Sequence, residues 1–119
     1  MRTLEDVTRI AGTDVLDYLD TSAAIPLSAG LQRQGDVGLL PVGLVGYGVP
    51  SDGKPVGAAC MALVNGNGGH THLLVADGPV LWSPIARPRE LGDVGIFTVP
   101  VGSAAYVLHA EHGALGHAP

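Results

Sequence analysis

Short apolar runs, each broken after a few residues by Gly, Pro, Asn or Asp, make up the sequence from residue 21 onward. This pattern is typical of many short strands in a sandwich or barrel. The candidate strands are Val37 to Val42, Ala58 to Val64, His72 to Val75, Val80 to Ser83, Gly95 to Val99 and Ala105 to His109. The sequence therefore predicts a mainly β fold, either a small β-sandwich or a partly open barrel.

The first twenty residues have a different pattern. In residues 3 to 20, apolar side chains recur at helical spacing, and Thr3 can cap the first turn. Gly12 and Thr13 are expected to divide this stretch into two short helices that pack on the core. We therefore expect an N-terminal helical segment over residues 1–20, a linker over 21–31 and a β domain over 32–119.

Two loop regions stand out within the β part. In VADGPVLW, residues 75 to 82, the pair Asp77-Gly78 lies between apolar runs and predicts a tight β-hairpin turn. In GLVGYGVPSDGKPVGAA, residues 43 to 59, the many glycines and prolines predict a long loop. Lys54 is expected to be a solvated turn residue in that loop.

The chain carries few charges for its size. Only 14% of its 119 residues are charged, against roughly 25% in typical soluble proteins, and 46% are apolar. A small domain has a large surface for its volume, so this composition leaves apolar surface outside unless something covers it. We expect the chain to form a homo-oligomer or to join a larger protein complex as an accessory or scaffold subunit.

Charge, hydropathy and cysteine content limit the other partners and the location. The apolar runs are shorter than the roughly 20 residues of a membrane-spanning helix, which leaves peripheral apolar contact only. A net charge of −5 and scattered basic residues argue against nucleic acid as a partner. The N-terminus lacks the features of a signal peptide, and the single Cys60 forms no internal disulfide, so we expect a cytoplasmic protein.

Two pairs of histidines are the candidate site. The candidate ligands are His70, His72, His109 and His112, together with Glu111. Strand residues two apart share a face, so the first pair can bind one ion together. If both pairs meet at one end of a barrel, they form a site for zinc or another transition metal. The alternative is a structural role, in which the ring N–H groups donate to loop carbonyls.

Other features of the sequence do not add a catalytic set. A cupin-like metalloprotein has a Glu three or four residues after its His-x-His pair, whereas LLVAD follows His72. VGSAAY, around Ser103, departs from the Gly-x-Ser-x-Gly pattern of a nucleophile turn. His117 is expected to be disordered near the end of the chain. We therefore expect a non-catalytic protein and assign no cofactor other than the candidate metal.

Three segments occur in an order that resembles a known family. RQGDVGLLPV, GGHTHLL and VPVGSAAYVLHAEHGALGHAP resemble small uncharacterised bacterial and phage β-domain proteins, over about residues 32 to 119. The resemblance implies an all-β fold, and His72, His109, Glu111 and His112 match polar positions of that family. Members of the family continue past the Ala-Pro with a further strand, so an edge strand open to a partner is expected here.

Three functions follow as hypotheses. The first is the non-catalytic accessory or scaffold subunit that composition favours. The second is a metal-binding domain or small cupin-like metalloprotein that uses the histidine pairs. The third is a phage-type capsid or decoration module, which shares the Gly-rich β composition.

Overall fold

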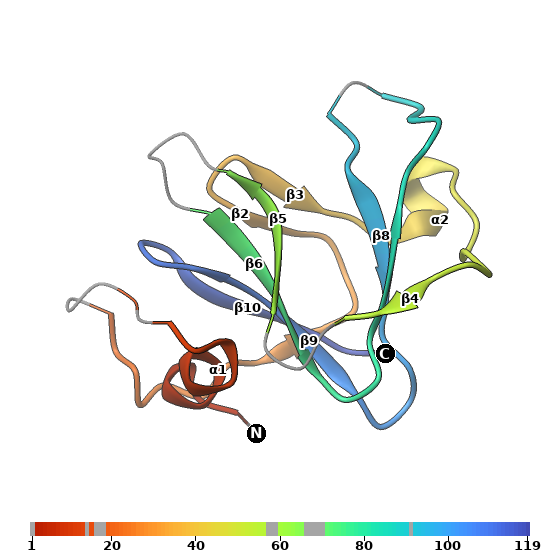
Figure 1. Cartoon of the computed structure of the whole chain (residues 1–119). Coiled ribbons are helices and arrows are strands. Elements are labelled where there is room, and N and C mark those ends of the chain that lie inside the picture. The colour runs from red at the N-terminus through yellow and green to blue at the C-terminus, as the bar shows by residue number, and fades with distance from the viewer. Residues whose placement is uncertain (1, 14, 16–18, 57–59, 66–70, 91) are drawn as a thin grey trace.

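A five-stranded sheet with the order β1–β10–β9–β6–β5 forms the centre of the molecule (Figure 1). The computed structural model describes residues 2–13, 15, 19–56, 60–65, 71–90 and 92–119. The strands of this sheet are β1 (Leu27–Ser28), β5 (Met61–Asn65), β6 (Thr71–Asp77), β9 (Ala104–His109) and β10 (Gly113–His117). β1 runs parallel to β10, and all other neighbours in the sheet are antiparallel.

Strand β9 is buried along its whole length because both faces of the central sheet are covered. Side chains alternate between the two faces of a strand. Tyr106 and Leu108 accordingly pack in one hydrophobic cluster, with Leu4 and Val7 of the N-terminal helix. Val107 packs in a second cluster on the opposite face. The central sheet therefore separates two cores.

Helix α1 (Leu4–Ala11) covers the first face of the sheet (Figure 1). Thr3 caps it: its hydroxyl accepts from the backbone N–H of Asp6, and the Asp6 carboxylate accepts from the backbone N–H of Thr3. Gly12 ends the helix in a left-handed conformation, as the sequence pattern indicated. The second helix expected after Gly12 falls largely on residues 14 and 16–18, which lie outside the described residues.

Two smaller sheets cover the second face. One is the hairpin of β2 (Gln32–Gln34) and β3 (Val37–Leu39), and the other has the order β4–β7–β8. The strands of the latter are β4 (Lys54–Pro55), β7 (Leu81–Pro84) and β8 (Gly95–Thr98). The three sheets do not close into one barrel (Figure 1). The expectation of a mainly β domain with a short N-terminal helix is confirmed.

The predicted hairpin at Asp77-Gly78 is wrong. β6 belongs to the central sheet, whereas β7 pairs with β4 and β8, so the chain crosses here from one sheet to the next. Gly78 has a φ of +112°, and a Cβ at this position would lie 2.4 Å from the Ser103 hydroxyl oxygen. Pro79 has no N–H to donate to a ladder. A tight corner against the start of β9 therefore replaces a two-strand turn.

The candidate strand Val37 to Val42 is too long. β3 ends at Leu39, and helix α2 (Val42–Val45) follows Pro41, whose φ of −56° suits the start of a helix. The predicted loop over residues 43–59 therefore contains most of α2 and, further on, β4. None of the described helices is both long and apolar enough to cross a membrane.

The expectation that His117 is disordered is also wrong. His117 is the last residue of β10 and pairs with Ala105 of β9 on one side and with Ser28 of β1 on the other. Its side chain packs against Phe97 and is almost fully buried. The two neighbouring strands fix this end of the chain, although the local sequence GALGHAP contains little that indicates a strand.

Candidate functional site

Three of the histidines singled out in the sequence lie together. Leu73 of β6 pairs with Leu108 of β9, so the next residues along these antiparallel strands, His72 and His109, lie opposite each other. The centroids of their rings are 4.5 Å apart, and the ring of His112 lies 4.6 Å from that of His109. The rings run from the buried His72 to the exposed His112. We call these three residues the histidine cluster.

The structure describes one of the other two predicted ligands, His70 and Glu111. His70 lies outside the described residues, so its relation to the histidine cluster stays a prediction. The backbone N–H of Glu111 donates to Nδ1 of His109 at 3.1 Å, which holds the turn between β9 and β10 against that ring. With its Nδ1 accepting, a neutral His109 carries its proton on Nε2.

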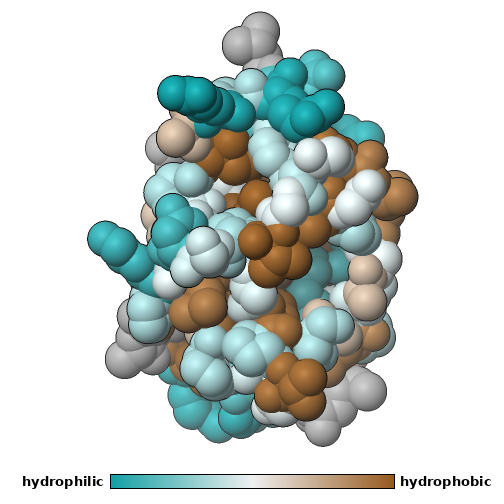
Figure 2. All heavy atoms as spheres, turned by 90° about the vertical axis from the view of Figure 1, so that its right-hand side faces the viewer, coloured by the Kyte–Doolittle hydropathy of each residue, from teal (hydrophilic) through white to brown (hydrophobic). Residues whose placement is uncertain are grey.

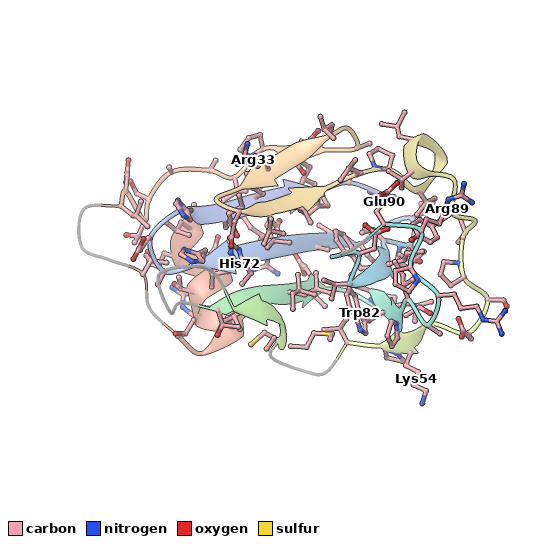
Figure 3. All side chains as sticks on the ribbon, turned by 90° about the horizontal axis from the view of Figure 1, so that it is seen from above. Arg33, Lys54, His72, Trp82, Arg89 and Glu90 are labelled. Carbon is pink, nitrogen blue, oxygen red and sulfur yellow. The ribbon has the colours of Figure 1, made fainter. Side chains whose placement is uncertain are left out.

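Gln34 of the β2–β3 hairpin fixes the orientation of His72. Its side-chain nitrogen donates to the backbone oxygens of Val107 at 2.9 Å and Gly113 at 3.1 Å. Its side-chain oxygen therefore faces Nδ1 of His72 at 2.9 Å. An amide oxygen only accepts, so Nδ1 of His72 carries a proton and donates it to Gln34. Figure 3 shows His72 pointing toward this hairpin.

Asp36 lies at the other nitrogen of His72. Its carboxylate oxygen Oδ1 is 3.3 Å from Nε2 of His72, and the Asp36 side chain is partly exposed. Gly35 makes this turn with a φ of +58°, and a Cβ there would lie 2.9 Å from Nε2 of His112. The turn between β2 and β3 thus places a carboxylate beside His72 and leaves room for the ring of His112.

Gln34 and Asp36 were not among the residues predicted for the site. Both stand in the segment RQGDVGLLPV, which the family resemblance quoted. Their role depends on the β2–β3 hairpin folding back over β9 and β10, a contact between residues more than 70 positions apart. The available signal in the sequence was the pair of polar residues, Gln34 and Asp36, on either side of Gly35. Such a pair does not by itself indicate which other side chains it contacts.

The donor atoms allow a test of the metal hypothesis. Ligand atoms about 2.0–2.1 Å from a tetrahedral zinc ion lie about 3.3–3.4 Å from each other. Nε2 of His72 and Oδ1 of Asp36 have this separation, and a metal-bound histidine commonly donates its other N–H, as His72 does to Gln34. Within the described ranges, however, no three His, Cys, Asp or Glu side chains are grouped to hold a metal ion.

A second feature is an apolar cavity of about 540 Å³ between the smaller sheets. Its walls come from β3, α2, β7, β8 and the end of β10, and they include Leu39, Val42, Trp82, Phe97 and His117. Asp36 also lines it, so the cavity adjoins the carboxylate beside His72. Figure 3 places Trp82 near β8, in a different part of the molecule from His72.

His117 is the most unusual polar group of the cavity. Its Nε2 is buried and finds no hydrogen-bond partner within the described part of the protein. The ring meets Phe97 edge to face, with 5.1 Å between centroids. Burial lowers the pKa of His117 to about 4, so the ring is neutral at pH 7.

A hydrogen-bond network ties together the two sides of the cavity at its α2 end. The hydroxyl of Tyr47, just after α2, donates to the carboxylate of Asp93 at 2.6 Å and accepts from the backbone N–H of Arg89 at 2.6 Å. The backbone N–H of Glu90 donates to the same carboxylate. These bonds hold the loop between β7 and β8 against the α2 segment.

The fold and these features define a small, mainly β domain that has a histidine cluster beside an apolar cavity. The chain belongs to the family described as "Domain of unknown function (DUF8820)", which matches residues 33–119. This family is uncharacterised, which is consistent with the resemblance, and the match covers the histidine cluster and most of the cavity wall. Comparisons with curated proteins and with solved structures found no match.

Proposed function

We propose that this protein is a non-catalytic subunit that associates with a second copy of itself through the face formed by α2. The observation that carries the proposal is α2 itself. The helix consists of Val42, Gly43, Leu44 and Val45, and none of these residues is buried. An apolar helix without a buried residue is stable when another surface covers it.

The apolar surface extends beyond the helix. Leu44 is 69% exposed and Val49 is 70% exposed, and both lie close to Tyr47 in the chain. Leu40 and Val94, two further exposed apolar residues, line the same cavity as Val49. Figure 2 views the molecule from this side and shows several hydrophobic patches between pale, weakly polar areas. We call Leu40, Leu44, Val49 and Val94 the α2 face.

Charge supports a second copy as the partner. Residues 37–49 contain no charged side chain, and the charged group that lies against Gly46 in this segment is the cationic guanidinium of Arg89, whereas the chain carries a net charge of −5. A neutral, apolar contact lets two copies meet without bringing their negative charges together at its centre. The same patch can meet itself about a two-fold axis, which is the commonest symmetry of homo-oligomers.

The test is the molar mass in solution, measured by light scattering after size exclusion over a range of micromolar concentrations. The wild type is expected to be a dimer, and Leu44→Ser to shift it toward the monomer. Val101→Ser is the matched control, because Val101 is 94% exposed but lies in the turn before β9, away from the cavity. A wild-type monomer at all concentrations, or an equal effect of both substitutions, contradicts the proposal.

The histidine cluster supports a second proposed function, the binding of zinc or a similar transition metal. The observation that favours it is the fixed ring of His72, whose Nδ1 donates to Gln34 while Nε2 lies beside Asp36. The proposed ligands are His72 and Asp36, with further ligands from His70, His109, Glu111 and His112. Cys60, the single cysteine, favours a reducing compartment such as the cytoplasm for either function.

Metal binding is tested by mass spectrometry of the native protein after exposure to Zn²⁺ and removal of the excess. We expect about one ion per chain in the wild type and a loss of binding in His72→Ala. His117→Ala is the control, because His117 belongs to the cavity and not to the histidine cluster. Zinc that is absent from the wild type, or equally retained by His72→Ala, contradicts this function.

A further inference from the structure

We propose that the cavity binds a small, largely apolar molecule that carries a hydroxyl group, and that the ring of His117 is the polar contact for that hydroxyl. His117 lies outside the α2 face and the histidine cluster, although Leu40, Val49 and Val94 of the α2 face also line the cavity. It would give the domain a ligand in addition to a protein partner.

The size and the lining of the cavity suit such a molecule. Its volume of about 540 Å³ lies within the roughly 300–1,000 Å³ of typical small-molecule sites. The side chains of Leu39, Leu63, Ile96, Phe97 and Val99 make much of the wall apolar. Ligand sites are typically apolar, with a few polar groups that fix the orientation of the ligand.

His117 is a second, independent indication of a ligand. The residue is only 7% exposed, lines the cavity and has a buried Nε2 without a partner among the described residues. Buried polar atoms nearly always have a hydrogen-bond partner, and an unpaired one destabilises the native state. A ligand that bonds to Nε2 removes this penalty. Because Nε2 itself is buried, the side chains that cover it must move to admit the hydroxyl, while the edge-to-face contact with Phe97 holds the ring at the cavity wall.

The protonation state of the His117 ring determines which polar group of a ligand can bond to it. A neutral imidazole has one N–H and one nitrogen lone pair, and either can be on Nε2. A hydroxyl can donate to the lone pair or accept from the N–H, so it matches both forms. An anionic ligand gains little here, because burial keeps the His117 ring uncharged at neutral pH.

Trp82 provides a direct assay. It is the only tryptophan of the chain and it lines the cavity. The probes are benzyl alcohol and toluene, which have the same ring and differ by the hydroxyl. Tryptophan is excited at the red edge of its absorption, where neither probe absorbs. Each probe is titrated into the full-length protein, and the change in Trp82 emission gives an apparent dissociation constant.

Both probes are expected to change the Trp82 emission in a saturable way. His117→Phe keeps an aromatic ring but removes the nitrogens. It should weaken the binding of benzyl alcohol by about threefold to tenfold, the effect of one neutral hydrogen bond, and leave toluene binding nearly unchanged. His112→Phe is the matched control, because His112 is exposed and outside the cavity. His117→Leu is measured in parallel, so that misfolding of one variant does not decide the result.

Two results overturn the proposal. One is the absence of a saturable change in the wild type with either probe. The other is a His117 variant that folds and binds benzyl alcohol as the wild type does, or that loses both probes equally. Repeating the titration in Leu44→Ser separates this inference from self-association, since Leu44 does not line the cavity. Hydroxyl-dependent binding in a monomeric variant supports the ligand site whatever the outcome for the dimer.

Discussion

Replacing Gln34 by Ala should destabilise the protein far more than its polar character suggests. Gln34 is 3% exposed and joins the β2–β3 hairpin to both β9 and β10. The substitution removes two bonds to backbone oxygens, each contributing about 0.5–1.5 kcal/mol. It also leaves the buried Nδ1–H of His72 without its acceptor, which costs about 1–3 kcal/mol. We expect a total loss of about 3 kcal/mol or more.

The expected loss can be measured by urea unfolding, followed by the emission of Trp82. For a domain of this size it corresponds to a fall in melting temperature of about 10–20 °C. Gln32→Ala is the matched control from the same strand. Gln32 makes one long bond, 3.3 Å, to the backbone oxygen of Gly116, and its own side-chain oxygen is buried without a partner among the described residues. Its loss should cost less than about 1 kcal/mol.

Equal effects of the two glutamine substitutions would refute this reasoning. They would mean that Gln34 does not hold His72 or the hairpin in the way the hydrogen bonds indicate. The m-value should stay the same in both variants, because neither change alters the surface exposed on unfolding.

Three further predictions concern the cavity and the N-terminal helix. Gly95→Ala should destabilise the domain by about 1–3 kcal/mol and shift the Trp82 emission, because the new Cβ would lie 2.4 Å from the indole of Trp82. Gly43→Ala is the control and should do neither, because no atom lies within 4 Å of the position of its Cβ. Folding lowers the pKa of His117 from 6.5 to about 4. The neutral ring therefore contributes stability that is complete above about pH 6.5 and is lost as the pH falls toward 4. The free energy of unfolding should have fallen by about 2 kcal/mol at pH 5. Urea unfolding at pH 7 and pH 5 should show this loss in the wild type and a smaller one in His117→Phe. Thr3→Ala should cost about 1 kcal/mol through the loss of the capping box, as measured by thermal unfolding, and an unchanged melting temperature would contradict this.

The parts of the fold that the sequence predicted are those with local signals. Thr3 and Gly12 mark the ends of α1, and the strand-like runs near residues 72, 81, 95 and 105 all fall on strands. The short apolar runs are enough to indicate these elements, because apolar side chains of these strands pack against a core.

The parts that were missed depend on contacts between distant segments. β10 and its buried His117 form because β9 and β1 pair with GALGH on either side, which no local pattern indicates. Asp77-Gly78 has the composition of a hairpin, yet the next strand joins a different sheet. In each case tertiary pairing decides the structure where local propensity gives a weak or a misleading signal.

The candidate site was likewise predicted in part. The spacing of the histidines raised the question of whether the pairs meet, and His72, His109 and His112 do lie together. Gln34 and Asp36 reach this cluster only through the β2–β3 hairpin, and the cavity forms between several segments that lie far apart in the chain. A sequence pattern reports the residue types of a site more readily than the long-range packing that assembles it.

Native mass spectrometry of the wild-type protein at micromolar concentration tests the proposed self-association most directly, because it reads the number of chains in each species. We predict a species with two copies of the chain, which Leu44→Ser reduces and Val101→Ser does not. A spectrum that contains only single chains under conditions where the protein stays folded would contradict the proposal that the α2 face joins two copies.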